Sequence, residues 1–206
     1  MEYCRTEQYS IRSFLFEMTN NVALKEWSAT CLALEEGRQI ALLRKGGLQD
    51  EEGVFSLEHQ RFWLLPTYLH QDETLVRPPH RDLLAKSRAS RLEGENKTVI
   101  ALRLWAEVAY VYELREERED ALRAAPHIWS EAYLETRFDY RPDKPLLCVL
   151  LRVFARDEPH VLPFQPEYFG CRSWIDLPSS LETPSHPALD DARFNEKLNE
   201  WRALLE

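Results

Sequence analysis

Residues 99–114 carry the pattern that most restricts the fold of this chain. Apolar side chains take every second position through most of the segment, which places six of them on one face of a single long strand: Leu102, Leu104, Ala106, Val108, Tyr110 and Tyr112. A strand of this length is stable only beside other strands. Residues 146–155 are almost continuously apolar, which is typical of a strand buried on both faces. The sequence therefore predicts a sheet built around these two segments.

Other segments predict shorter strands and several helices. We expect strands over residues 39–44 and 61–65, the second ending at Pro66, and helices over most of residues 116–138. Intervals of three and four predict an amphipathic helix that begins at Asn20-Asn21 and ends at Gly37, and a second one at the C-terminus. Their apolar positions are, respectively, Leu24, Trp27, Cys31 and Leu34, and Phe194, Leu198, Trp201 and Leu205. This combination favours an α+β fold with one mixed sheet.

The length of 206 residues is near the upper end for a single hydrophobic core. We expect one domain over residues 1–206, with a variable head at 1–20. Residues 74–97 contain Pro78-Pro79 and many charges, and are predicted to form a long excursion from the core. Residues 187–206 are predicted to dock on the core as the C-terminal helix.

The charge balance restricts the nucleic-acid ligands that the chain can bind. With 26 Lys+Arg against 35 Asp+Glu, the formal net charge is -9, which disfavours unspecific attraction to phosphate backbones or anionic lipid. Residues 38–91, however, hold nine Lys+Arg and seven Asp+Glu. A small basic site on an acidic protein is therefore compatible with the composition.

The four cysteines are widely spread and form no CxxC pair, which is typical of free thiols in a reducing compartment. The first residues carry acidic side chains, and no apolar stretch approaches the length of a membrane span. We therefore expect a cytoplasmic protein that does not bind membranes.

The first candidate site follows the strand predicted over residues 39–44. Two adjacent cations at a strand end, followed by two glycines that allow close backbone approach, could bind an anion: Arg44, Lys45, Gly46 and Gly47. The same residues also describe a solvated hairpin tip, so this alternative stays open. Neither GxxxxGK[ST] nor GxGxxG occurs in the chain.

The second candidate segment lies just beyond Pro66, where polar side chains can project from a strand end: Thr67, Tyr68, His70 and Gln71. An imidazole beside an amide can donate and accept hydrogen bonds toward a planar ligand. Tyr68, Trp63 and Trp174 could stack on a base, although aromatic side chains at such positions usually fill a core. Ser173 lies beside Trp174 and completes the predicted pocket.

Catalytic and metal-binding patterns are weaker. His70 could act as an acid or base, and Cys171 could be a nucleophile because Arg172 is adjacent. Ser173 is not in a GxSxG motif, the histidine spacing matches no zinc site, and Glu95-Asn96-Lys97 resembles a nuclease E-x-K element only in spacing. The sequence thus predicts no cofactor and no metal, and favours a role without catalysis.

Four blocks in this order resemble a bacterial family, domain of unknown function 1802, that is common in cyanobacteria: Lys25-Glu26-Trp27, residues 42–47, Pro66-Thr67-Tyr68-x-His70-Gln71 and Gly170-Cys171-x-Ser173-Trp174. The resemblance covers about residues 22–205. Some members are associated with an Mrr-type nuclease domain, which implies a link to restriction-modification or defence, but no such domain is visible here. The order of elements is also similar to the ASCH and PUA-like β-barrels, many of which bind RNA or modified bases. That second resemblance implies a barrel-like sheet.

These observations lead to one leading hypothesis and two alternatives. The leading hypothesis is a binding module for a nucleotide, a modified base or a nucleic-acid end, in which Arg44 and Lys45 neutralise phosphate and His70 with Gln71 read a polar edge. The first alternative is a small hydrolase or transferase that uses His70 and Cys171. The second is a protein-interaction subunit whose contact surface is the C-terminal helix or the excursion at 74–97.

Overall fold

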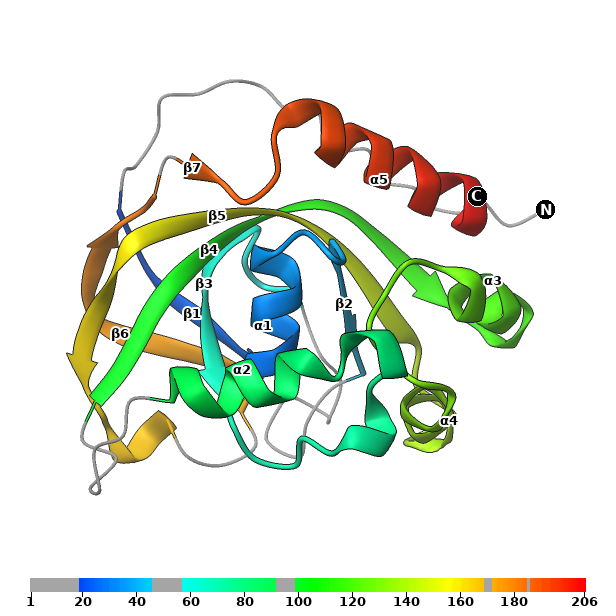
Figure 1. Ribbon diagram of the computed structural model, residues 1–206, viewed down its shortest axis with the longest axis horizontal. Coiled ribbons are helices and arrows are strands. Elements are labelled where there is room, and N and C mark those ends of the chain that lie inside the picture. The colour runs from blue at the N-terminus through cyan, green and yellow to red at the C-terminus, as the bar shows by residue number, and fades with distance from the viewer. Residues whose placement is uncertain (1–18, 46–56, 92–98, 169–171, 185) are drawn as a thin grey trace.

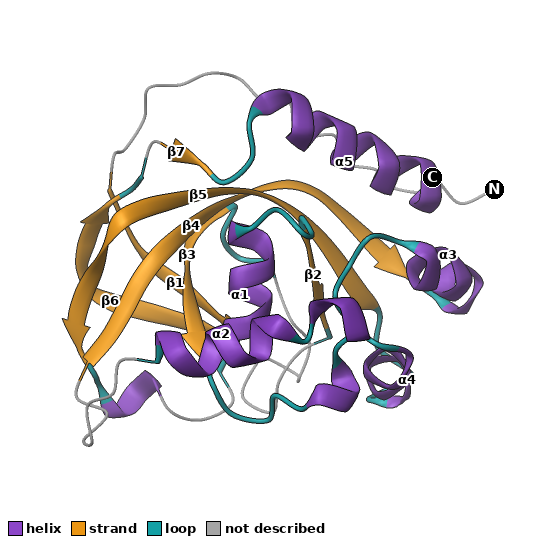
Figure 2. Cartoon of the chain, in the orientation of Figure 1, coloured by secondary structure: helices purple, strands orange, loops and turns teal. Residues whose placement is uncertain are grey.

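The computed structural model describes residues 19–45, 57–91, 99–168, 172–184 and 186–206. Strands and helices are interspersed along the chain, with the helices gathered mainly around one end of the sheet (Figure 2). The strands are β1 (Thr19–Trp27), β2 (Ala41–Arg44), β3 (Arg61–Thr67), β4 (Val99–Leu114), β5 (Leu146–Pro163), β6 (Trp174–Glu182) and β7 (His186–Pro187). The α-helices are α1 (Ser28–Glu35), α2 (Asp82–Ser90), α3 (Glu119–Ala124), α4 (Glu131–Asp139) and α5 (Asp191–Leu205).

The strands form one mixed sheet in the order β2-β5-β4-β3-β1-β6, with β7 added to β5. Strands β1 and β3 are parallel and the other ladders are antiparallel. The α+β class predicted from the sequence is therefore confirmed.

The sheet is not closed into a barrel, which corrects that part of the expectation. Among the described residues, the strands at the two ends of the order do not pair with each other: β2 pairs with β5, and β6 pairs with β1. Two side chains of β5 still reach the end of β6: Arg156 Nη1 and His160 Nε2 lie 3.3 and 2.9 Å from the carbonyl oxygen of Glu182. Side chains, in place of a backbone ladder, thus join these two strands.

The long strand predicted at 99–114 is confirmed as β4, but its apolar residues do not share one face. Its pairing with β5 shifts register between Leu102 and Leu104, and again between Val108 and Tyr110. Because a one-residue shift turns the following side chains to the other face, β4 contributes to three separate apolar clusters. Simple alternation across the segment could not show these two irregularities.

The helix predicted from Asn20-Asn21 to Gly37 is wrong in its first half, because residues 19–27 form β1 and only Ser28–Glu35 are helical. Strand β1 lies between β3 and β6, and apolar clusters cover both of its faces, so the consecutive residues Ala23 and Leu24 are both buried. The end of the helix is as expected, since Gly37 adopts a φ of +64°.

Residues 74–91 of the predicted excursion are ordered as two short 3-10 helices and α2. An ion-pair network ties α2 to the end of α1: Arg38 contacts Glu36 and Asp82, and Lys86 contacts the same two carboxylates.

Helix α5 buries Phe194, Leu198, Trp201 and Leu205 in the largest apolar cluster, together with α3, α4 and parts of β4 and β5 (Figure 1). These are the four positions that the sequence spacing selects. In the described part of the chain, no helix is long and apolar enough to cross a membrane.

Candidate functional site

The turn from β1 into α1, at Lys25–Ser28, is where the predicted site segments meet. Arg44 at the end of β2 donates from Nη1 to the carbonyl oxygen of Lys25 at 3.1 Å and lies 3.3 Å from Glu26 Oε2. Both charged side chains are largely buried, with 14% of Arg44 and 8% of Glu26 exposed. In Figure 1 the ends of β1, β2 and β3 lie at one side of the molecule, close to the start of α1.

The end of β3 and the segment that follows it are hydrogen-bonded to Lys25–Ser28 and to the start of α1. Thr67 donates from Oγ1 to the carbonyl oxygen of Glu26 at 3.1 Å. Gln71 accepts from the backbone N–H of Ala29 at 2.9 Å and donates to the carbonyl oxygen of Thr67 at 3.0 Å. Helix α1 receives no side-chain cap from Trp27, its N-cap residue, so Gln71 satisfies one of its first N–H groups. The side-chain oxygen and nitrogen of Gln71, which we expected to bind a ligand, are thus both hydrogen-bonded within the fold.

Tyr68 also faces the start of α1. Its hydroxyl makes hydrogen bonds with Ser28 and Ser90, and its burial raises the pKa of the phenol. The guanidinium carbon of Arg91, at the end of α2, lies 5.8 Å from the centre of the ring. Tyr68 is half-buried, its hydroxyl contacts hold the ring in place, and a guanidinium lies over it. The ring is therefore suited to present an aromatic surface to a ligand.

The fourth predicted block joins the site through its backbone. Lys25 donates its N–H to the carbonyl oxygen of Ser173 at 2.9 Å, and its own carbonyl oxygen is the acceptor of Arg44. In an antiparallel ladder the N–H and C=O of one residue point to the same neighbour, so Ser173 and Arg44 lie on the same edge of β1. The Ser173 residue itself is buried.

The side chains of Lys45 and Trp174 have other contacts: Lys45 borders the site at the end of α4, and Trp174 packs on aromatic rings. Lys45 is 4% exposed and donates to the carbonyl oxygens of Arg137 and Phe138, which end α4. Its burial lowers the pKa of the ammonium group. Trp174 packs edge-on against His59 and Phe62, with ring centres 5.0 Å apart in each case. Gly46, Gly47 and Cys171 lie outside the described residues.

Four further residues belong to the candidate site but were not predicted as site residues: Glu26, Arg91, Tyr133 and Arg137. The ring of Tyr133 packs edge-on against Trp27, with centres 5.1 Å apart, and Arg137 lies over Tyr133 at 5.0 Å. Burial raises the pKa of Tyr133, while its phenol and the Glu26 carboxylate raise the pKa of Arg137. In the sequence, Glu26 was marked by the block Lys25-Glu26-Trp27, and Tyr133 and Arg137 by their i, i+4 spacing, which places both on one side of α4.

The electrostatic balance of the site is positive. Arg44 contacts Glu26, the carboxylate in direct contact with an arginine here, whereas Arg91 lies over the ring of Tyr68 and Arg137 over the ring of Tyr133. Guanidinium groups bind phosphate or carboxylate through paired hydrogen bonds, and an adjacent half-buried tyrosine offers a surface for a planar group. The arrangement can therefore bind an anion that carries a ring system.

His70 lies beside this network without joining it. It is exposed and adopts a φ of +59°, a left-handed conformation that is uncommon for residues other than glycine. Among the described residues, no three His, Cys, Asp or Glu side chains lie close enough to hold a metal ion.

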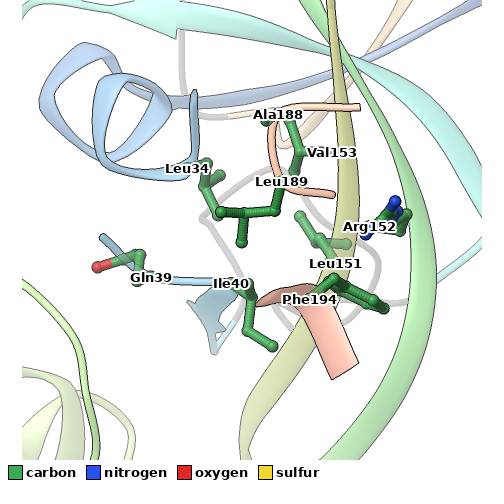
Figure 3. A pocket seen from close by; sticks show the side chains of 9 residues that line it. All are labelled: Leu34, Gln39, Ile40, Leu151, Arg152, Val153, Ala188, Leu189 and Phe194. Atoms are coloured by element: carbon green, nitrogen blue, oxygen red, sulfur yellow. The ribbon is translucent and has the colours of Figure 1, made fainter. Parts of the chain in front are cut away.

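A small apolar pocket lies elsewhere, between α1, β5 and the segment that leads into α5 (Figure 3). Leu34, Leu151 and Leu189 are among its lining residues, and none of the predicted site residues is. The pocket is therefore separate from the site at Lys25–Ser28.

Comparison with known proteins places the chain beside an uncharacterised family. A family model described as a domain of unknown function (DUF1802) matches residues 23–200. No curated protein matches. Two solved structures of ZmASCH from Zymomonas mobilis, one a serine-to-alanine and the other a tyrosine-to-phenylalanine mutant, are each 13% identical. They cover 86% of this chain, the chain covers 93% and 95% of theirs, and the TM-scores are 0.42 and 0.40.

Proposed function

The chain belongs to the DUF1802 family, a domain of unknown function, and for this member we propose a binding function: the site at Lys25–Ser28 binds the phosphate of a nucleotide or of a nucleic-acid end. The observation that carries the proposal is the convergence of distant segments on Lys25–Ser28, with Arg44 beside Glu26, and with Arg91 and Arg137 over two tyrosine rings of these segments, Tyr68 and Tyr133.

The two outer arginines are the better phosphate ligands. Arg91 is exposed and Arg137 is half-buried, whereas Arg44 is largely covered and paired with Glu26. A buried carboxylate beside Arg44 fixes the position of that guanidinium, and it limits the charge that the site must hold when no ligand is bound. We therefore assign contact with phosphate to Arg91 and Arg137, and a positioning role to the Arg44–Glu26 pair.

Tyr68 is the residue that would favour a nucleotide over free phosphate. Its ring lies beside Arg91, so one ligand could place its phosphate at the guanidinium and its base against the aromatic ring. Stacking on an aromatic ring tolerates any base, because every base has a π face. This part of the proposal predicts weak sequence preference.

The alternatives from the sequence gain no support from the geometry. His70 makes no contact with the described network of the site, and Cys171 lies outside the described residues, so no observation favours a hydrolase or transferase. A protein-interaction subunit, the link to restriction-modification and a cytoplasmic location stay predictions.

The experiment measures fluorescence anisotropy with fluorescein-labelled 12-nucleotide single strands of DNA and RNA that carry a 5′-phosphate or a 5′-hydroxyl. The wild-type chain should prefer the phosphorylated strands. Arg137→Gln and Arg91→Gln should each weaken binding about tenfold, the loss of one charge-assisted hydrogen bond. Together they should lower the slope of log K against log salt by about 1.4.

Arg202→Gln is the matched control, because Arg202 also lies over a tyrosine ring, that of Tyr110, but on α5. Its affinity should equal that of the wild type. For Arg44, the double variant Glu26→Gln/Arg44→Gln avoids a lone buried charge. Equal affinity of the wild type for phosphorylated and hydroxyl ends, or an unchanged salt slope in the double arginine variant, would contradict the proposal.

A further inference from the structure

The tip formed by Leu69 and His70 stands out beside the proposed site. It is fixed on both sides, by the hydroxyl contacts of Tyr68 with Ser28 and Ser90 and by the amide contacts of Gln71 with Ala29 and Thr67. Between these anchors the side chain of Leu69 is 61% exposed. The apolar side chain of Leu69 is therefore exposed to solvent, while the residues on both sides of the tip, Tyr68 and Gln71, are held by contacts with the rest of the protein.

A single exposed leucine is common on protein surfaces and needs no explanation by itself. Two observations distinguish Leu69. The residue after it, His70, has a φ of +59°, and strained backbone of this kind persists where the surrounding structure fixes it, frequently at ligand sites. The residue before it is Tyr68, whose ring carries Arg91. An apolar group, an imidazole, an aromatic ring and a cation thus lie together along a fixed edge.

We propose that Leu69 packs against an unstacked base next to the terminal phosphate, so that the ligand of this site is an unpaired nucleic-acid end. The inference rests on the proposed function and narrows it. Proteins that unstack bases insert apolar side chains between them, and recognition of single strands relies on base faces that a duplex covers. A paired, stacked end would offer Leu69 no apolar surface, whereas an unpaired base could contact Leu69 on its face and His70 at its edge.

The test uses a 5′-phosphorylated 12-nucleotide DNA strand with 2-aminopurine as its first base, alone and in a blunt duplex. Fluorescence of 2-aminopurine reports whether the first base is stacked, and competition with the labelled strand gives the affinity. We expect the full chain to prefer the single strand and to change the 2-aminopurine signal on binding. Leu69→Ser should lose that change and bind about tenfold more weakly, with an unchanged salt slope because no charge is removed.

Val161→Ser is the matched control. Val161 on β5 is 55% exposed, so the variant removes a similar apolar surface from a different strand and should behave as the wild type. Thermal melting of both variants checks that the fold is intact, as expected for exposed positions.

The outcomes separate this inference from the proposed function. If phosphorylated strands bind with the predicted salt slope, but Leu69→Ser keeps the wild-type affinity and 2-aminopurine signal, the proposed contact of Leu69 with a base is wrong and the proposed phosphate site is retained. Equal affinities for the duplex and the single strand would also contradict the proposed contact of Leu69 with a base. If no phosphorylated strand binds, both fail. If Leu69→Ser changes only the oligomeric state seen in size-exclusion chromatography, the tip is a protein contact and the proposed contact of Leu69 with a base is wrong.

Discussion

His127 provides a test of the core that does not depend on the proposed ligand. The imidazole lies between α3 and α4, is 1% exposed, and packs against the ring of Trp129 at 5.0 Å. Trp129 donates its backbone N–H to Nδ1 at 3.2 Å, so the proton is on Nε2, which donates to the carbonyl oxygen of Leu122 at 2.8 Å. The neutral ring is thus fully satisfied.

Protonation of this ring in the folded state is unfavourable. Burial, and then the positive charge of Arg77 at 3.3 Å from Nε2, lower the pKa of His127 from 6.5 to about 4. In the unfolded chain the pKa returns to about 6.5. Between these values the unfolded state binds more protons, so the stability that His127 contributes is complete above pH 6.5 and is lost as the pH falls toward 4.

The size of the effect follows from the two pKa values. Lowering the pH from 7.5 to 5 should cost about 2 kcal/mol through His127, and the full loss below pH 4 is about 3 kcal/mol. Urea unfolding of the wild type and of His127→Gln at half-unit steps of pH gives the free energy of unfolding of each. Gln keeps a donor for Leu122, and any packing cost that does not depend on pH cancels in the difference between the two profiles.

We expect the wild type to lose about 2 kcal/mol more than His127→Gln between pH 7.5 and 5. Parallel profiles of wild type and His127→Gln would refute the assignment of His127 as a buried neutral group.

Three further substitutions test local features of the fold. Gly37→Ala should lower the free energy of unfolding by about 2 kcal/mol or more, because φ is +64° and the added Cβ would collide with Leu189 Cδ2. In a double-mutant cycle, Gly37→Ala/Leu189→Ala should recover only the part of this loss that comes from the collision. Gln71→Ala should destabilise α1 by about 1 kcal/mol, measured by urea unfolding. Asp82→Asn should speed hydrogen exchange in α2 at low salt but not at high salt; an equal effect at both would contradict an ion-pair role.

The parts of the fold that the sequence predicted well are those in which one strong period decides the structure. The spacing of Phe194 and Trp201 predicted α5, and the apolar runs predicted β4 and β5. Strand β1 was missed because Leu24 and Trp27 happen to fit a helical interval, while the burial of β1 on both faces depends on strands that arrive much later in the chain.

The gathering of some candidate site residues follows from the same strand pattern. Arg44, Thr67 and Tyr68 do gather at one turn, because each stands at or just beyond a strand end on that side of the molecule. Lys45 could not be separated from Arg44 by sequence, since its neighbour α4 begins more than 80 residues later. Glu26 has its role only because β2 and β1 end close together in space.

The pairing of Leu24 with Trp174 has a consequence for the order of folding. Strand β1 precedes β2, β3, β4 and β5 along the chain, and its partner β6 follows them, so β1 is made before the strand with which it pairs. Until then one edge of β1 has no partner, and unpaired edges of this kind are prone to associate with other chains. Because Lys25 contacts both Arg44 and Ser173, the proposed site is assembled only after the segment at Ser173 has been made and has paired with β1.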